Sequence, residues 1–414
     1  MALPKTSPVE NDMTFPPDAV VDHHQIVIVG GGTGGITAAA RLLRANKRMD
    51  VAIIEPSEKH YYQPMWTLVG GGIATKESTE RDEASVIPKG ATWIRDFVEK
   101  FDPENNRLLT RGGRVIAYGH LILSPGIQLD WGKVKGLKET MGKNGVCSNY
   151  SYETVDSTWV ALQNLKKGNA IFTFPNTPIK CGGAPQKIMY LVADFLKKNK
   201  LEAGTQVIFA SAGEKIFGVE KYRLALEKIV ARYGIETRFM HNLIEVRGDA
   251  KEAVFKNLKT GADEVIPFQM LHVVPPMSGP DFLKDTPLTD AAGFVTVDQG
   301  NLRHTKFDNV WALGDVANVP TAKTGAAVRK QAPVLVEHLL ASLDGGSASS
   351  TYTGYSSCPL VTGYGKLMLA EFDYDSQPME TFPFNQAKER RSMWILKKNV
   401  LPTLYWKGML KGRA

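Results

Sequence analysis

The sequence predicts an α/β protein with two Rossmann-like dinucleotide-binding domains, the first of which is discontinuous. Three observations support this class. A short β-branched run at residues 25–29 leads directly into a glycine-rich turn and an Ala/Leu-rich helical stretch. A second α/β stretch begins near residue 151. After it, a further strand-like segment ends at Gly314 and Asp315, where the chain is expected to return to the first domain.

The composition is that of an ordinary globular protein. The chain has 414 residues, of which 43% are hydrophobic and 22% charged, with a formal net charge of +7. Three cysteines are too few for a secreted disulfide scaffold, and no run of about 20 apolar residues predicts a membrane-spanning helix. The first 22 residues resemble neither a signal peptide nor a transit peptide.

The predicted organisation has five parts. They are a flexible N-terminal lead-in (1–22), the first part of the dinucleotide-binding domain (23–150), a second Rossmann-like domain (151–287), the second part of the first domain (288–345) and a C-terminal region (346–414).

The glycine-rich turn after the first strand has the spacing of a dinucleotide-binding loop. Gly30, Gly32 and Gly35 form G-x-G-x-x-G, which allows a tight turn, close approach of pyrophosphate and close packing of helix on strand. A second strand, residues 51–54, ends at Glu55, twenty positions after Gly35. A carboxylate there can accept hydrogen bonds from ribose hydroxyls. The loop alone leaves open whether the cofactor is NAD or FAD.

Downstream segments favour FAD. Residues 307–315, FDNVWALGD, resemble the second FAD signature of flavoproteins with two dinucleotide-binding domains, in which the Asp of the Gly-Asp pair binds the ribityl chain. Residues 118–126, YGHLILSPG, resemble the strand that closes the FAD domain. The helix after Lys323 is expected to direct its N-terminus at the flavin. The predicted FAD contacts are Gly30, Gly32, Thr33, Gly34, Gly35, Glu55, Gln63, Val98, Gly126, Gly314, Asp315 and Lys323.

The second Rossmann-like domain lacks a usable nicotinamide loop. Its buried-strand pattern at residues 205–212 leads into Gly213-Glu-Lys-Ile-Phe-Gly218, which has glycines only at its ends. The bulky Ile216 and Phe217 would keep the backbone away from a pyrophosphate. We therefore expect an electron donor other than NAD(P)H.

Two cysteines lie in Pro/Gly-rich surroundings typical of a site. Cys181 follows TFPNTPIK and precedes GGAPQKIMYL, and Cys358 begins CPLVTGY. With LAEFDY, ETFPF and KER following in order, the chain from about His24 onward resembles the sulfide:quinone oxidoreductases, particularly the mitochondrial-like branch. The resemblance implies that Cys181 and Cys358 form a redox-active pair, bridged by a disulfide or by an additional sulfur.

The implied reaction follows thiol chemistry. Hydrogen sulfide attacks the bridge as a thiolate attacks a disulfide. By the resemblance, Cys358 keeps the added sulfur as a persulfide, and Cys181 donates electrons to the flavin. A sulfur acceptor (sulfite, glutathione or a second sulfide) then removes the sulfur.

Two positions depart from bacterial members of this family. Lys187 stands six residues after Cys181, where many bacterial members have a glutamate, so a carboxylate-assisted step is in doubt. Cys147 lies near the position of a third cysteine in other bacterial members, and it either assists the reaction or has no part in it.

The C-terminal segment is basic and aromatic. Between Lys388 and Ala414 eight basic residues accompany one acid, Glu389, and are interleaved with Trp, Tyr and Leu. This pattern predicts an amphipathic, membrane-associating segment that Pro402 divides into two short helices. The alternative is a helix packed on its own protein or on a partner copy. No motif accompanies the patch that would predict nucleic-acid binding.

A quinone acceptor would enter from the membrane beneath the flavin. By analogy with relatives, its channel is expected to involve Phe372, Tyr374, Phe382, Phe384 and Lys397. No metal site is predicted, and a homo-oligomer is possible. The expected location is the periphery of a bacterial inner membrane. Alternatives are a type II NADH:quinone dehydrogenase, the flavoprotein subunit of a sulfide dehydrogenase with a haem partner, and a flavin-binding sulfide sensor without turnover.

Overall fold

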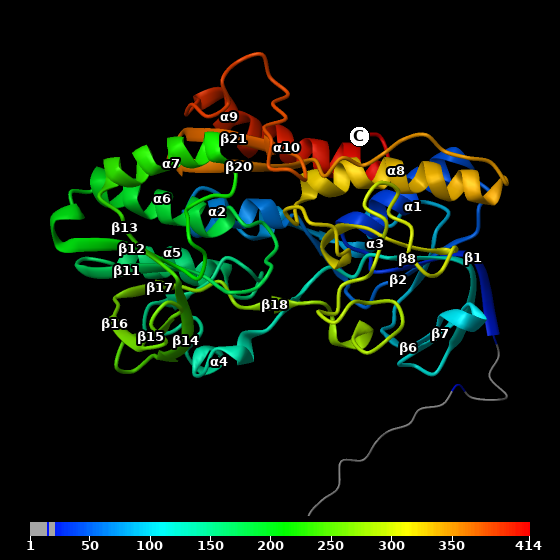
Figure 1. The fold of residues 1–414 in the computed structure, drawn as a ribbon, viewed down its shortest axis with the longest axis horizontal. Coiled ribbons are helices and arrows are strands. Elements are labelled where there is room, and N and C mark those ends of the chain that lie inside the picture. Colours follow the sequence, from blue (N-terminus) through cyan, green and yellow to red (C-terminus); the bar gives the residue numbers. More distant parts are fainter. Residues whose placement is uncertain (1–14, 16–20) are drawn as a thin grey trace, which may run out of the picture.

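The computed structural model describes residue 15 and residues 21–414 (Figure 1). The predicted lead-in at 1–22 therefore lies almost entirely outside the described residues. In the part that is described, the first domain is built on a seven-stranded sheet ordered β5-β2-β1-β8-β7-β6, with β19 also paired to β8. Its strands are β1 (Val21–Val29), β2 (Val51–Ile54), β5 (Thr92–Ile94), β6 (Val98–Asp102), β7 (Arg107–Thr110), β8 (Val115–Leu123) and β19 (Val310–Ala312).

The first βαβ unit forms as the sequence predicts. Ile26 to Val29 of β1 are buried between parallel neighbours β2 and β8, and each buried aliphatic side chain stabilises the fold by about 1.5–3 kcal/mol. Helix α1 (Thr33–Ala45) follows the glycine turn. Gly30 has φ +102°, and a Cβ on Gly35 would lie 1.9 Å from the Gly30 carbonyl oxygen, so both positions require glycine.

The remaining elements of the first domain surround this sheet. They are the antiparallel strand pair β3 (Lys59–Tyr61) and β4 (Glu80–Asp82) and the helices α2 (Trp66–Gly70), α3 (Glu83–Val86) and α8 (Gly325–Leu343). Helix α8 spans the predicted range after Lys323 and packs on α1. The return of β19 to β8 confirms that the first domain is discontinuous.

The second domain has a parallel sheet of its own, ordered β10-β17-β11-β12-β13. Its strands are β10 (Val146–Cys147), β11 (Gly168–Phe174), β12 (Thr205–Ser211), β13 (Glu236–Phe239) and β17 (Met270–His272). Its helices are α4 (Leu137–Thr140), α5 (Val155–Asn164), α6 (Ala184–Lys198) and α7 (Glu220–Tyr233), and an antiparallel sheet joins β14 (His241–Arg247), β15 (Glu252–Asn257) and β16 (Asp263–Pro267). Both α4 and β10 belong to this part of the fold although they precede residue 151, the start predicted for the second domain.

The two chain crossings between the domains lie side by side. β9 (Gln128–Leu129) pairs antiparallel with β18 (Met277–Ser278). The chain thus leaves and re-enters the first domain through a paired connection.

The C-terminal region covers both domains. The hairpin of β20 (Ser356–Gly363) and β21 (Lys366–Phe372) packs on α6, and the tail after it continues to α1 (Figure 1). The tail contains α9 (Arg391–Ile395) and α10 (Leu401–Thr403), each followed by a π-helical turn.

The expectation that Pro402 divides the tail is wrong. Residues 391–411 remain one helical run, because Pro402 lies in the first turn of α10 and the wider π-helical turns at Leu396–Val400 and Leu404–Gly408 accommodate its ring. Within the described residues, no helix combines the length and apolar character that crossing a bilayer requires.

Candidate active site

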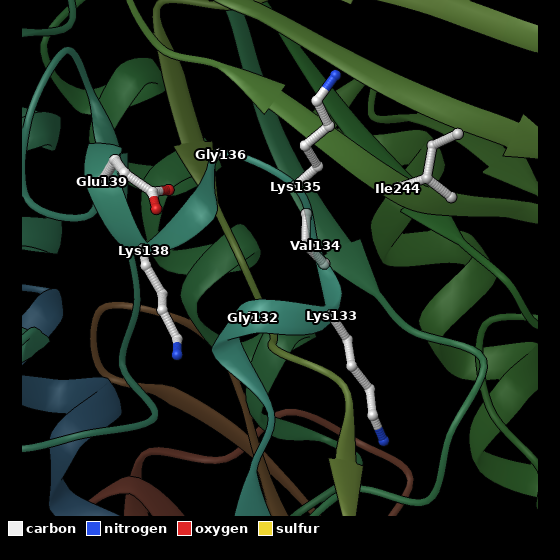
Figure 2. Close-up of a pocket in the computed structure, with 8 residues that line it drawn as sticks. All are labelled: Gly132, Lys133, Val134, Lys135, Gly136, Lys138, Glu139 and Ile244. Carbon is white, nitrogen blue, oxygen red and sulfur yellow. The ribbon is translucent and has the colours of Figure 1, made fainter. Parts of the chain in front are cut away.

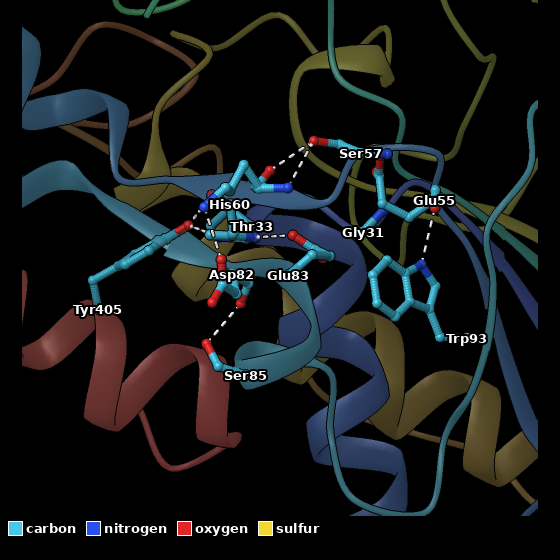
Figure 3. A network of polar contacts seen from close by, with 11 residues as sticks. Gly31, Thr33, Glu55, Ser57, His60, Asp82, Glu83, Ser85, Trp93 and Tyr405 are labelled. Carbon is cyan, nitrogen blue, oxygen red and sulfur yellow. Dashed lines mark hydrogen bonds and ion pairs between the residues drawn. The ribbon is translucent and has the colours of Figure 1, made fainter. Parts of the chain in front are cut away.

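Glu55 contacts the glycine loop directly. Glu55 lies at the end of β2, and its carboxylate accepts hydrogen bonds from the Gly31 N–H at 2.7 Å and the Ser57 N–H at 2.7 Å (Figure 3). Burial raises the pKa of Glu55, although both N–H donors oppose the shift. The indole of Trp93 donates to the Glu55 carbonyl at 2.9 Å and fixes the strand end. Ser57 and Trp93 were not predicted; the Trp93 contact depends on the pairing of β2 with β5, whereas Ser57 lies only two residues after Glu55.

The loop has room for a dinucleotide. A Cβ built at Gly32, at Gly126 or at Gly325 would meet no protein atom within 4 Å, although the glycines at 30 and 35 are tightly enclosed. Gly32 is the N-cap of α1, and no side chain caps this helix end, which leaves its first N–H groups without a side-chain acceptor. These features fit a cofactor pyrophosphate at the start of α1.

The second predicted cofactor segment lies at the end of β19. Gly314 has φ +79°, and its N–H donates to Gln331 Oε1 at 2.9 Å. The Lys323 ammonium donates to the carbonyl oxygens of Asp315 at 2.7 Å and Ala317 at 3.0 Å. Burial raises the pKa of Asp315, and the cations Lys323 and Lys180 oppose that shift. The structure thus brings Gly314, Asp315 and Lys323 together in one turn.

Two predicted contacts lie in less specific settings. Gln63 is exposed at the start of the short 3-10 helix Gln63–Met65, and Val98 is buried in the core at the start of β6. Their assignment to FAD stays a prediction.

The two redox cysteine candidates converge from different elements. Cys181 lies in the turn between β11 and α6 with φ +52°, and its N–H donates to the Lys323 carbonyl at 2.8 Å. Cys358 is buried on β20. A Cβ added to Gly183 would lie 3.6 Å from Cys358 Cβ, so the Cys181 turn packs directly against this strand. All three cysteines of the chain are free thiols here.

The surroundings of the pair set its electrostatics. Burial raises the pKa of the Cys358 thiol to about 12, and the charge of nearby Cys181 adds to the shift, while Lys187 opposes it. The buried Lys187 ammonium lies 3.2 Å from Cys181 Sγ. Although burial lowers the pKa of Lys187, the two cysteine sulfurs and this hydrogen bond raise it overall. The arrangement stabilises negative charge on Cys181.

Two further lysines face the same cluster. Lys397, on the C-terminal tail, is buried and donates to the Pro64 carbonyl at 2.8 Å. Burial and the nearby Lys187 lower the pKa of Lys397 to about 7. Burial likewise lowers the pKa of Lys180 to about 8, against the attraction of Asp315 and Cys181. Lys180 was not predicted, and its position next to Cys181 is the signal that could have identified it.

Cys147 has a different environment. Its thiol is fully buried on β10, 3.6 Å from the Leu271 carbonyl oxygen, and burial raises its pKa to about 12. These contacts are those of a core thiol.

The predicted quinone-contacting aromatics form separate groups. Phe372 packs edge-to-face on Phe217, with ring centroids 6.0 Å apart. Tyr374 packs on Tyr352 at 5.6 Å and donates to the Gln299 carbonyl. Phe382 stacks on Phe384 at 5.3 Å. None of these packing pairs includes Lys397. The quinone assignments stay predictions.

The degenerate loop of the second domain is filled by protein. Ile216 is buried, and Phe217 packs between Tyr222 and Phe372 of the C-terminal hairpin. The following helix α7 begins with Glu220, a negative charge at the helix end that would otherwise attract a phosphate. Both features agree with the predicted loss of the nicotinamide site.

A separate pocket lies away from this cluster. It has a volume of about 370 Å³ and opens near α4 (Figure 2). It is lined by Gly132, Lys133, Val134, Lys135, Gly136, Lys138, Glu139 and Ile244, none of which was predicted as a site residue. Lys133 and Lys135 are paired with Asp130 and Glu245, so the pocket is not a concentrated positive site.

The fold and the cysteine site define the class of protein. A family model described as pyridine nucleotide-disulphide oxidoreductase matches residues 24–158. This is an oxidoreductase class that implies a flavin cofactor, consistent with the two dinucleotide-binding domains.

Relatives define the family within this class. The chain is 50% identical over 392 residues to the mitochondrial sulfide:quinone oxidoreductase of Dictyostelium discoideum, covering 94% of this chain and 86% of the relative. It is 49% identical over 392 residues to the corresponding protein of Mus musculus, covering 94% and 87%. The chain belongs to the sulfide:quinone oxidoreductase family.

A solved structure shares the fold. The sulfide:quinone oxidoreductase of Aquifex aeolicus superposes with a TM-score of 0.81 at 18% identity, covering 95% of this chain and 92% of that chain. The expectation of a bacterial inner-membrane location gains no support from the curated relatives above, which are both described as mitochondrial.

Proposed function

We propose that Cys181 and Cys358 form the redox pair of this sulfide:quinone oxidoreductase, and that FAD lies between the glycine loop and the Gly314–Asp315 turn. The observation that carries the proposal is the hydrogen bond from the Cys181 N–H to the Lys323 carbonyl, at 2.8 Å. It joins the cysteine turn to the segment that resembles the second FAD signature. Cys181 is accordingly the cysteine on the cofactor side, and Cys358 lies behind it on β20.

The residues of the chain divide the sulfide step between them. Hydrosulfide attacks the Cys358 sulfur of the bridge, a new S–S bond forms, and the bond to Cys181 breaks. Cys181 leaves as a thiolate, which the Lys187 ammonium stabilises from 3.2 Å. The persulfide on Cys358 then transfers its outer sulfur to a nucleophilic acceptor, such as sulfite, glutathione or sulfide. FAD, when bound, supplies the two-electron relay from the reduced pair to quinone.

The lysines also control protons in this enclosed space. Lys187 remains charged because the cysteine sulfurs raise its pKa. Lys397, whose pKa is about 7, can bind or release a proton near neutral pH. The Lys187 ammonium is therefore a fixed positive charge beside Cys181, and Lys397 in the same cluster can transfer a proton.

The tail is proposed to bind the membrane through its outer face only. Met393, Lys397, Tyr405, Met409 and Leu410 are buried against the protein. Ile395 and Val400 are 47% and 49% exposed, and Lys398, Lys407 and Lys411 of the same tail are also exposed. This mixture of apolar and basic groups suits an anionic membrane surface from which quinone is drawn.

An anaerobic titration tests the proposed function. Sulfide should bleach the flavin absorbance of the purified protein, and a short-chain quinone should restore it. NADH given to a second sample should leave the spectrum unchanged. Bleaching by NADH alone would refute the proposal and favour an NADH dehydrogenase. Sulfide bleaching that only a co-purifying cytochrome reverses would favour a sulfide dehydrogenase subunit.

A further inference from the structure

The C-terminal tail is joined to the glycine loop by a buried tyrosine. The Tyr405 hydroxyl lies 2.9 Å from Thr33 Oγ1 and 2.6 Å from His60 Nε2 (Figure 3). Thr33 is the first residue of α1, immediately after the glycine turn. Tyr405 and His60 are 3% and 4% exposed, so water does not substitute easily for these hydrogen bonds.

The histidine is in turn held by a carboxylate that faces the same loop. Glu83 Oε2 lies 3.2 Å from His60 Nδ1. The other oxygen, Oε1, is buried and has no protein hydrogen-bond partner, and a Cβ added to Gly31 would lie 2.7 Å from it. The series Glu83–His60–Tyr405–Thr33 therefore begins and ends at the glycine loop, and Tyr405 is its one member from the tail.

Packing fixes the position of this tyrosine. The Tyr405 ring lies 4.5 Å from the Tyr62 ring, and the guanidinium of Arg81 lies 4.9 Å from the ring of Trp406. Further along, Gly412 adopts φ +65° and fits against the backbone of Ala40 in α1. The tail thus covers α1 from its first residue to its middle.

We propose that Tyr405 is a positioning residue for FAD binding. Its hydroxyl, oriented by His60, holds Thr33 in the conformation that the glycine loop needs to receive the cofactor pyrophosphate at the start of α1. Cofactor and tail then stabilise each other, since a coupling free energy between two sites is reciprocal. This inference rests on the FAD binding that the proposed function includes.

The first test measures FAD affinity without turnover. FAD is removed from the holoprotein and titrated back while flavin fluorescence is followed. Tyr405→Phe keeps the ring but leaves Thr33 and His60 without the hydroxyl. We expect FAD to bind about 5- to 30-fold more weakly, as the loss of one or two buried hydrogen bonds predicts.

The control is Tyr222→Phe. Tyr222 is also fully buried, and its hydroxyl lies 3.2 Å from Glu380 Oε1, joining the C-terminal region to α7 instead of to α1. Its FAD affinity should stay within about twofold of wild type. Equal weakening in both variants, or none in Tyr405→Phe, would overturn the inference.

The second test uses the unmodified protein. Hydrogen exchange of backbone amides in residues 401–411 should slow when FAD is added, whereas exchange in α7 should not change. Exchange of 401–411 that is indifferent to FAD would overturn the coupling while leaving the proposed function intact. Failure of the wild-type protein to bind FAD would instead refute the proposed function and this inference with it.

Discussion

The Lys187 ammonium lies 3.2 Å from the sulfur of Cys181, six residues earlier in the chain. The contact depends on the local backbone: Cys181 lies in a turn with φ +52°, and α6 begins three residues later, which directs Lys187 back toward the turn. A buried cation is thereby fixed beside the cysteine proposed to leave as a thiolate.

Lys187→Met should slow both the sulfide reaction and alkylation of the cysteine pair. Losing a charge-assisted hydrogen bond to the leaving sulfur should lower kcat/KM for sulfide by about 10- to 150-fold. Iodoacetamide alkylation of the reduced protein should also become slower, because the thiolate loses its counter-ion. Lys198→Met, on the exposed side of the same helix, should change neither quantity. An unchanged alkylation rate in Lys187→Met would contradict the assigned role.

Cys358→Ser should retain FAD but lose bleaching by sulfide. Without Cys358 no bridge can form, so the rate of sulfide-dependent flavin reduction should fall by about 1,000-fold or more. Stopped-flow absorbance under anaerobic conditions measures this rate. Cys147→Ser should retain bleaching, because the Cys147 thiol contacts the Leu271 carbonyl within the core. Normal reduction in Cys358→Ser would refute the cysteine mechanism.

Lys397→Met should stabilise the fold most at low pH. In the folded protein burial lowers the pKa of Lys397 to about 7 from the ordinary 10.5. Below pH 7 both the folded and the unfolded chain carry the charge, and the folded protein bears the full cost of burying it. Between pH 7 and 10.5 the unfolded chain binds more protons, so wild-type stability recovers as pH rises.

The readout is the difference in Tm between Lys397→Met and wild type at a series of pH values. This difference should be largest below pH 7 and shrink toward pH 10.5, the window set by the two pKa values. The exposed neighbour Lys398 provides the control variant, Lys398→Met, which should show no such trend. A difference that does not vary with pH would indicate that burial does not lower the pKa of Lys397.

Ile395→Ser combined with Val400→Ser should weaken binding to anionic liposomes. Each side chain is about half exposed on the outer face of the tail, so losing both should lower the partition coefficient by about 10- to 30-fold. Leu224→Ser combined with Val265→Ser removes two equally exposed apolar side chains elsewhere. If both pairs co-sediment with liposomes equally well, the tail is not the membrane contact. Truncation before Lys388 is a poorer test, because it would also remove the buried Tyr405 and Leu410.

Phe217→Gly should not create NADH oxidation. The variant opens the degenerate loop, but Phe372 still covers it, and Glu220 still opposes a phosphate at the start of α7. NADH-dependent bleaching of the flavin should stay at background in wild type and variant alike. Bleaching in the variant would show that Phe217 alone blocks the nicotinamide site.

The sequence was sufficient for the parts of the fold that depend on local patterns. The strand at residues 25–29, the glycine spacing and Glu55 are read from neighbouring residues, and the structure arranges them as expected. The return of residues 310–312 to β8 was predictable because the Gly-Asp pair resembles a known signature. The proposed pairing of Cys181 with Cys358 likewise comes from motif resemblance, since 177 residues separate the two positions.

Contacts between distant segments were not predictable in the same way. No local pattern indicates that His60 meets Tyr405, 345 residues away, or that Lys397 reaches the Pro64 carbonyl. The tail illustrates this limit. Its basic and aromatic composition suits contact with a membrane and contact with a protein surface equally well. In the structure, its inner face packs against the protein. The prediction for Pro402 was wrong because proline breaks regular α-helical turns, whereas π-helical turns flank Pro402 here.

The Thr33–Tyr405 hydrogen bond also has a consequence for biosynthesis. The two residues are 372 positions apart, so at about 5–20 residues per second the ribosome adds Tyr405 about 20 to 75 s after Thr33. During that interval the nascent glycine loop and α1 lack their cover. If Tyr405 positions the loop for FAD as proposed, stable capture of the flavin follows translation of the tail, and cofactor loading is a late step of maturation.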